Sequence, residues 1–364
     1  MKKEAVLYQK LEDKKVQCNV CARRCVIKDG QRGNCTTRMN EGGTLYTLIY
    51  GSLISRGSID PVEKKPLYNF YPGHSIYSIA SVGCNFHCTM CQNWSISQCY
   101  PNENGTMAIC DDAGHHGNSF ELLSIPPKAL VDSVRRSDCN LLAFTYNEPT
   151  IWHEYVIDVA ELAHRETIKN VLVTNGYSTP EASKDLVKVI DAANIDFKAF
   201  TDAFYQNIVK VNALQPVLDT AEYWKSHGMH IEITNLIIPQ ENDNPKEIQS
   251  MCEWIVSHLG PDTPIHFSAY HPDYKMQNHT RTPINTLENA YKIAKIAGLY
   301  FVYIGNVQSS LGNNTICYHC NELLIERTGY AISKINLSVD NRCPNCGEPS
   351  YIQGMGKKRV GFFF

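Results

Sequence analysis

The sequence has no long hydrophobic run and almost no excess of charge of either sign. Its 364 residues carry 34 basic and 37 acidic side chains, for a net charge of −3. This balance leaves no basic surplus to attract nucleic acid or an anionic membrane surface. No stretch approaches the roughly 18 apolar residues of a membrane-spanning helix. We therefore expect neither nucleic acid nor a membrane among its partners.

The first ten residues also lack the apolar core of a secretory signal. We therefore expect a cytoplasmic protein, and in that reducing compartment cysteines rarely form disulfides. The chain nevertheless has 15 cysteines, of which four lie in residues 18–35, three in 84–91 and four in 317–346. Clustered cysteines in a reducing compartment indicate metal binding.

The central group reads Cys84-Asn-Phe-His-Cys88-Thr-Met-Cys91. Three thiolates in one short loop can hold three irons of a [4Fe-4S] cluster and leave the fourth iron without a protein ligand. The preceding residues, 75–83, alternate and are rich in β-formers, so the loop is expected at the end of a strand. The alternative is a zinc knuckle with a distant fourth ligand.

Two C-x2-C knuckles near the C-terminus, separated by 22 residues, are typical of a zinc ribbon. Their cysteines are Cys317, Cys320, Cys343 and Cys346. Four thiolates close a tetrahedral shell around zinc with no open position. A rubredoxin-like iron site would use the same ligands.

The N-terminal group fits zinc or an iron–sulfur (Fe–S) cluster equally well. It consists of Cys18, Cys21, Cys25 and Cys35. Four arginines lie among or near these cysteines: Arg23, Arg24, Arg32 and Arg38. They either offset the negative charge of a thiolate–metal centre or form a solvated basic face.

From about residue 75 to 305, strand-like and helix-like segments alternate, as in βα repeats around a parallel sheet. The expected strands are residues 76–82, 141–145, 170–174, 194–197, 230–237 and 264–268, with a seventh at 300–304. Threonines before proline, at Thr179 and Thr282, predict capped helix starts. We predict an α/β protein with a partial (β/α)6-type TIM barrel, whose chemistry gathers at the carboxyl ends of the strands.

Three domains are expected: a metal-binding module with four cysteines over 1–45, the partial barrel over 70–308 and a zinc-ribbon-like module over 315–350. A polar insert at 98–126 contains His115 and His116. We interpret it as a solvated loop or as a lid over the site.

Further polar motifs follow the expected strand ends. They are Thr145-Tyr-Asn-Glu-Pro149, Asp196-Phe-Lys198, Pro264-Ile-His-Phe-Ser-Ala-Tyr-His-Pro-Asp-Tyr-Lys-Met276 and Tyr303-Ile-Gly-Asn306. With these motifs and the cysteine loop, nearly the whole chain resembles radical S-adenosylmethionine (SAM) proteins of the pyruvate formate-lyase-activating-enzyme-like branch. Within that branch it is most similar to the AmmeMemoRadiSam system radical SAM enzymes.

The resemblance implies reductive cleavage of SAM at a [4Fe-4S] cluster, giving a 5′-deoxyadenosyl radical that abstracts hydrogen from an unidentified substrate, a protein among the candidates. It also implies an electron donor such as flavodoxin or ferredoxin, and protein partners from the AmmeMemoRadiSam system. The second candidate is activation of a glycyl-radical enzyme. A non-catalytic metal-binding scaffold with a vestigial barrel is the alternative from another class.

The resemblance also assigns SAM contacts. The residues concerned are Met90, Glu148, Asp196, Lys198, His271 and Asn306. Glu148 would accept the SAM amino group, and the Asp196–Lys198 motif would contact its methionine moiety. His271 would lie near the adenosine, Met90 would pack on the adenine through its sulfur, and Asn306 would line the far rim. A helix-capping surface role for Glu148 and an ordinary loop role for His271 are the alternatives.

Overall fold

The computed structural model describes residues 1–101, 107–109 and 121–358. Its centre is an eight-stranded sheet in the order β18-β17-β16-β15-β14-β13-β9-β8. All neighbouring pairs from β18 to β9 are parallel, and β8 (Ser58–Pro61) adds an antiparallel edge strand. The parallel strands are β9 (Ser75–Ile79), β13 (Leu141–Phe144), β14 (Lys169–Thr174), β15 (Ala192–Asp196), β16 (His230–Ile237), β17 (Ile265–Ala269) and β18 (Val302–Gly305).

The predicted α/β fold with a parallel sheet is confirmed. Each of the seven expected strands is present, and the expected bounds 230–237 are those of β16. The strands are nearly continuous apolar runs because helices cover the sheet on one face and the barrel interior lies on the other. Among the described residues the edge strands β8 and β18 do not pair, so the barrel is open.

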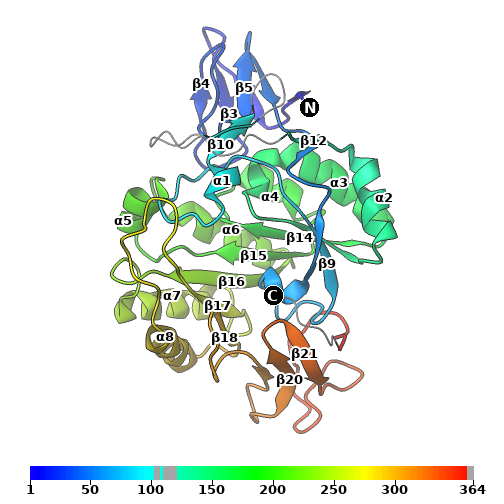
Figure 1. Cartoon of the computed structure of the whole chain (residues 1–364), viewed down its shortest axis with the longest axis vertical. Helices are drawn as coiled ribbons and strands as arrows, with labels where there is room; N and C mark the ends of the chain where they lie inside the picture. Colours follow the sequence, from blue (N-terminus) through cyan, green and yellow to red (C-terminus); the bar gives the residue numbers. More distant parts are fainter. Residues whose placement is uncertain (102–106, 110–120, 359–364) are drawn as a thin grey trace.

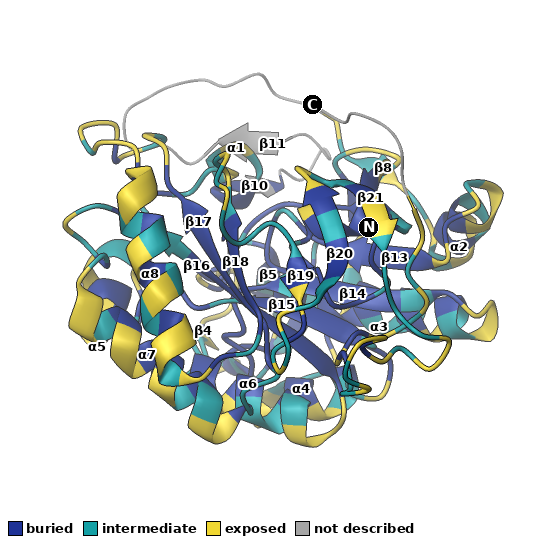
Figure 2. Cartoon of the chain, turned by 90° about the horizontal axis from the view of Figure 1, so that it is seen from below, coloured by how far each residue is buried: buried dark blue, intermediate teal, exposed yellow. Residues whose placement is uncertain are grey.

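Helices connect successive strands and lie on the outside of the sheet (Figure 1). The longer ones are α2 (Pro127–Arg136), α3 (His153–Arg165), α4 (Pro180–Leu186), α6 (Gln215–Ser226), α7 (Pro245–His258) and α8 (Ile284–Ala297). The short ones are η1 (Val62–Lys64), α1 (Trp94–Ser97), η2 (Pro149–Trp152), α5 (Asp202–Phe204) and η3 (Tyr205–Val209). Figure 2 shows that the longer helices expose their outward faces and bury the faces toward the sheet. Among the described residues, none of the helices has the length and apolar character needed to cross a bilayer.

One of the two predicted helix caps is confirmed and the other is wrong. The Thr179 hydroxyl oxygen accepts the Ala182 N–H at 3.2 Å and caps α4. Thr282 instead accepts the Tyr270 N–H at 2.8 Å and donates to the Ile237 carbonyl at 2.5 Å. The Thr282 hydroxyl thus bonds to backbone groups at the end of β16 and just past β17, and it does not cap the helix.

The N-terminal module consists of two small antiparallel sheets, β1-β6-β5 and β2-β3-β4. Their strands are β1 (Lys3–Glu4), β2 (Tyr8–Lys10), β3 (Val16–Cys18), β4 (Val26–Ile27), β5 (Arg38–Glu41) and β6 (Thr44–Thr47). Val16, Val20 and Leu45 belong to a small core of their own. After the module, β7 (Ser52–Leu53) pairs with β12 (Leu123–Ser124).

Only part of the predicted 98–126 insert is described. β10 (Cys99–Pro101) and β11 (Met107–Ile109) form an antiparallel pair there. His115 and His116 lie outside the described residues.

The C-terminal module is a three-stranded antiparallel sheet at the opposite end of the long axis from the N-terminal module (Figure 1). Its strands are β19 (Thr315–Ile316), β20 (Leu323–Thr328) and β21 (Ala331–Ile335). The buried Arg327 donates to the Tyr68 carbonyl at 2.8 Å and to the Thr315 hydroxyl at 2.7 Å. The segment carrying Tyr68 precedes β9, so the module lies at the amino ends of the parallel strands.

Candidate active site at the carboxyl ends of the strands

The loop that follows β9 carries Cys84, Cys88 and Cys91 at the carboxyl edge of the sheet. The Phe86 N–H donates to Cys84 Sγ at 3.4 Å, and the Ser97 hydroxyl lies 3.0 Å from Cys91 Sγ. The loop is entered through Gly83 with φ +79°, where an added Cβ would lie 2.8 Å from a neighbouring backbone oxygen. Only glycine combines that left-handed conformation with so close an approach.

Burial controls the protonation of these three thiols. It raises the pKa of Cys84, with a further contribution from the Glu148 carboxylate. It raises the pKa of Cys88 to about 12, although the Lys198 ammonium opposes the shift. Burial likewise raises the pKa of Cys91. As free thiols they are protonated at neutral pH, so metal binding here must release protons.

Glu148 follows β13 and is buried rather than exposed on the surface. Its Oε1 accepts the Thr150 N–H at 2.9 Å and the hydroxyls of Thr150 and Thr174, both at 2.7 Å. Its Oε2 accepts the Asn175 N–H at 2.8 Å. Burial raises the pKa of Glu148 even though these donors favour the carboxylate. Glu148 therefore caps η2 and also joins two strand ends, and Oε2 keeps capacity for a further donor.

Asp196 and Lys198 lie at the end of β15 and form an ion pair. Lys198 Nζ is 2.7 Å from Asp196 Oδ2. Burial alone would lower the pKa of Lys198, but Asp196 and the Cys88 thiol outweigh it and the pKa is raised. Lys198 therefore stays a cation beside the cysteine loop. Its positive charge favours the thiolate form of Cys88, whereas the Glu148 carboxylate disfavours that of Cys84.

Two asparagines that the sequence analysis did not assign complete the polar surroundings. Asn175 follows β14, and its Nδ2 donates to Asn85 Oδ1 at 2.7 Å and lies 3.9 Å from Cys84 Sγ. Asn85 Nδ2 is buried and has no acceptor among the described residues. Buried donors in proteins are almost always paired. A bound group that offers an acceptor beside Cys84, such as a cluster sulfide, therefore fits this site.

The remaining predicted contacts lie at varying distances from the loop. His271, after β17, is half exposed, and its Nδ1 lies 3.0 Å from Gln92 Nε2, next to Cys91 in the chain. Asn306, after β18, donates to the Ala269 carbonyl at 3.2 Å. Met90 is 3% exposed and belongs to the main hydrophobic core. The fold thus brings His271 to the cysteine loop and places Asn306 at the neighbouring strand end.

The four C-terminal cysteines converge on one point. Cys317 Sγ is 3.6 Å from Cys346 Sγ, and Cys320 Sγ is 3.6 Å from Cys343 Sγ. All four sulfurs lie within 4.8 Å of one another, and no other group of three or more potential metal ligands among the described residues is as compact. Two sulfurs bound to one zinc at about 2.3 Å each can be at most about 4.6 Å apart, so this set suits a single metal ion.

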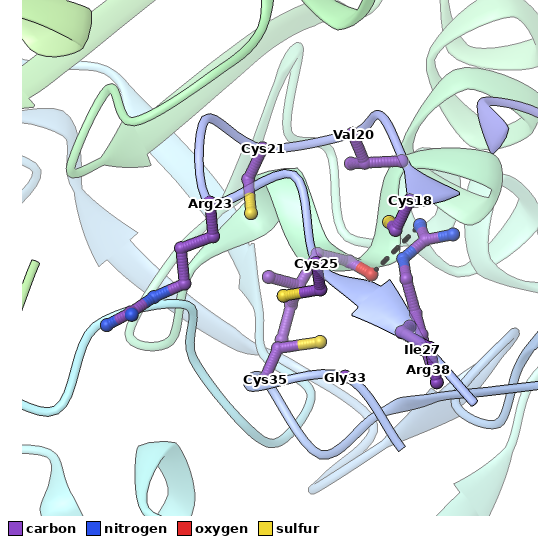
Figure 3. Close-up of a pocket in the computed structure, with 10 residues that line it drawn as sticks. Cys18, Val20, Cys21, Arg23, Cys25, Ile27, Gly33, Cys35 and Arg38 are labelled. Carbon is purple, nitrogen blue, oxygen red and sulfur yellow. Dashed lines mark hydrogen bonds between the residues drawn. The ribbon is translucent and has the colours of Figure 1, made fainter. Parts of the chain in front are cut away.

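The four N-terminal cysteines line a single cavity together with Arg23 and Arg38 (Figure 3). Cys18, Cys21 and Cys35 are buried, and Cys25 is half-buried. Of the four arginines, Arg23 and Arg38 line this cavity and are not part of a solvated basic face. Arg38 is buried and paired with Glu154 of α3, with Nη2 2.7 Å from Oε2. Arg23 donates to the backbone carbonyls of Asn85 and Lys210.

The sequence is similar to those of known proteins. Residues 78–255 match the family model of the Radical SAM superfamily. Over 347 residues the chain is 42% identical to the uncharacterized protein MJ0808 of Methanocaldococcus jannaschii, covering 95% of this chain and 98% of that protein. The chain therefore belongs to the radical SAM superfamily.

Two solved structures are among those similar to it. A domain of pyruvate-formate lyase-activating enzyme from Bacteroides vulgatus has a TM-score of 0.39 and 17% identity, covering 45% of this chain and 98% of that one. Streptococcus suis SuiB bound to precursor peptide SuiA has a TM-score of 0.45 and 13% identity over 69% of this chain. The match spans 52% of the SuiB chain. By its match to the family model, the protein is a radical SAM enzyme, with the cluster and SAM as the cofactors that this family implies.

Proposed function

We propose that this enzyme holds its [4Fe-4S] cluster on Cys84, Cys88 and Cys91 and binds SAM over the carboxyl ends of β13 to β18. One observation carries the assignment: the partly buried three-thiol loop lies at the strand ends that carry an acceptor, Glu148, and a cation, Lys198. Three ligands leave one iron of a four-iron cluster without protein coordination. That vacancy is where SAM would chelate the cluster.

The chain's residues can be given separate roles. When bound, the cluster and SAM supply one-electron cleavage of the sulfonium and hydrogen abstraction. Glu148 Oε2 would accept the SAM ammonium in addition to the Asn175 N–H. Lys198 offsets the negative charge of the thiolates, and Asp196 holds its ammonium in place at 2.7 Å. Asn85 Nδ2 supplies a buried donor to the bound group.

We further propose that the enzyme acts within the pyruvate formate-lyase-activating-enzyme-like branch, as an AmmeMemoRadiSam system member with protein partners from that system. A carrier of the flavodoxin or ferredoxin class would supply the electron. The strand-end motifs at 145–149, 196–198 and 264–276 support this assignment. We also propose zinc at the C-terminal cysteines, because all four sulfurs lie within 4.8 Å of one another and two pairs are 3.6 Å apart.

The test is anaerobic reconstitution with iron and sulfide, followed by addition of SAM and dithionite. The native chain should form 5′-deoxyadenosine and methionine, detected by chromatography. Cys88→Ala should abolish both products. Cys252→Ala removes a buried cysteine of α7 outside the three groups and serves as the matched control, with product formation retained. A native chain with a full four-iron cluster but no 5′-deoxyadenosine would favour the non-catalytic scaffold instead.

A further inference from the structure

The N-terminal sulfurs are spread more widely than the sulfurs of the C-terminal set. Ligand sulfurs on a single zinc lie within about 4.6 Å of one another. All four C-terminal sulfurs lie within 4.8 Å of one another, close to that limit, whereas no three of the N-terminal sulfurs do so. All four nevertheless line the same cavity (Figure 3). A polynuclear cluster with four cysteine ligands has the larger dimensions that this arrangement requires.

A buried donor lies on the wall of the same cavity. Arg38 is 1% exposed, and two of its nitrogens donate to Glu154 at 2.8 and 2.7 Å. Its Nε has no acceptor among the described residues. The Thr37 hydroxyl also donates to Cys35 Sγ at 3.3 Å. Cluster sulfides and thiolates accept such hydrogen bonds, and a buried guanidinium offsets their negative charge.

The cavity lies directly against the cysteine loop of the proposed active site. An added Cβ on Gly83, which precedes Cys84, would lie 2.8 Å from the Cys35 carbonyl oxygen. Cys35 and Cys84 also line a second cavity in common. Arg23, which follows Cys21 by two residues, donates to the Asn85 carbonyl. The two ligand loops therefore touch.

We propose that Cys18, Cys21, Cys25 and Cys35 hold a second iron–sulfur cluster through which electrons reach the cluster on Cys84, Cys88 and Cys91. The relay role rests on the proposed function, whereas the cluster assignment does not. One electron leaves a reduced low-potential carrier of the flavodoxin or ferredoxin class and reduces the N-terminal cluster. The same electron then passes to the active-site cluster, which returns the N-terminal cluster to its oxidised form. No atom or proton is transferred between the two sites.

The cluster assignment is tested in a chain that cannot build the active-site cluster. Cys84→Ala/Cys88→Ala/Cys91→Ala leaves the N-terminal ligands intact. After anaerobic reconstitution, this variant should keep two to about four irons with matching sulfide per chain, and a cluster signal in Mössbauer and electron paramagnetic resonance spectra. Adding Cys18→Ala and Cys21→Ala should remove that signal. Zinc in place of iron at the N-terminal site of the triple variant, with no sulfide, would overturn the assignment.

The relay is tested in the opposite background. Cys18→Ala/Cys25→Ala should lose the N-terminal cluster signal and keep that of the active-site cluster. SAM cleavage driven by reduced flavodoxin should then be lost, while cleavage driven by dithionite, a small reductant, should persist. Equal loss with both reductants at full active-site cluster content would overturn the relay. If the native chain cleaves no SAM with any reductant, the proposed function fails, and the triple variant still decides the cluster assignment.

Discussion

The two four-cysteine modules have the same ligand number and opposite positions on the barrel. The C-terminal set is closed around one point and lies at the amino ends of the strands, against the segment that carries Tyr68. The N-terminal sulfurs are spread more widely and line a cavity at the carboxyl ends, against the loop that carries Cys84. In βα barrels chemistry gathers at the carboxyl ends and the other face serves stability. Because the ligand number is the same, it is the position on the barrel that supports our proposal of a structural role for the C-terminal module and of electron transfer for the N-terminal one.

The modules are also anchored by different buried ion pairs. Arg38 and Glu154 form a two-pronged pair at 2.8 and 2.7 Å. Arg327 Nε and Glu63 Oε1 are 3.6 Å apart, and Glu63 Oε2 has no hydrogen-bond partner among the described residues. Burial opposes ionisation of both carboxyl groups, but Arg38 overcomes it and lowers the pKa of Glu154. At Glu63 burial prevails over Arg327, and the pKa is raised.

The largest effect is expected from breaking the closed C-terminal site with Cys343→Ser. Structural zinc contributes about 10–16 kcal/mol to the folding of small zinc modules, so residues 315–350 should unfold. Limited proteolysis should cut within this module, and the metal content should fall by about one ion per chain. Dithionite-driven formation of 5′-deoxyadenosine should remain. A loss of activity in proportion to the lost metal would contradict a purely structural role for this module.

Removing the anchor of the N-terminal module should have the next largest effect. Glu154→Gln leaves the Arg38 cation buried without its partner, which destabilises by about 3–5 kcal/mol. The free energy of unfolding, measured by chemical denaturation, reports the loss. Glu63→Gln is the matched control at the other module and should cost less, because the Arg327–Glu63 pair is longer and less satisfied. Equal losses in the two variants would show that the difference in pair geometry does not matter.

The same two carboxyl groups predict opposite responses to pH. The pKa of Glu154 is depressed in the folded state, so its contribution is full above 4.5 and is lost as pH falls through the folded value. The pKa of Glu63 is raised, so its contribution is full below 4.5 and is lost as pH rises through the folded value. The measurement is the free energy of unfolding as a function of pH, below and above 4.5, for the native chain and both variants. The pH dependence due to Glu154 should be absent in Glu154→Gln, and that due to Glu63 should be absent in Glu63→Gln.

Patterns within a continuous stretch of sequence predict the strands well. They do not predict contacts between residues that are distant in the sequence. The run 230–237 was bounded correctly because eight consecutive residues share one buried strand. Thr282 was assigned to a helix cap because the local signal is a hydroxyl before proline, whereas its partners lie in β16 and past β17. The Arg38–Glu154 pair joins residues 116 positions apart, so no local pattern contains it. The cysteine spacing likewise predicts how many thiols each group contains. The distances between their sulfur atoms depend on the folded backbone and do not follow from the spacing.

The smallest predicted effect is a shift in reduction potential after removal of one hydroxyl beside each of the two cysteine groups at the carboxyl edge. Thr37→Val removes the bond to Cys35 Sγ, and Ser97→Ala removes the contact with Cys91 Sγ. Hydrogen bonds to ligand sulfur stabilise the reduced, more negative cluster, so losing one lowers the reduction potential. In anaerobic redox titrations, Thr37→Val should lower the potential of the N-terminal cluster and Ser97→Ala that of the active-site cluster. Because each substitution leaves the other cluster's ligands untouched, a single potential that moves in both variants would mean that only one cluster is present.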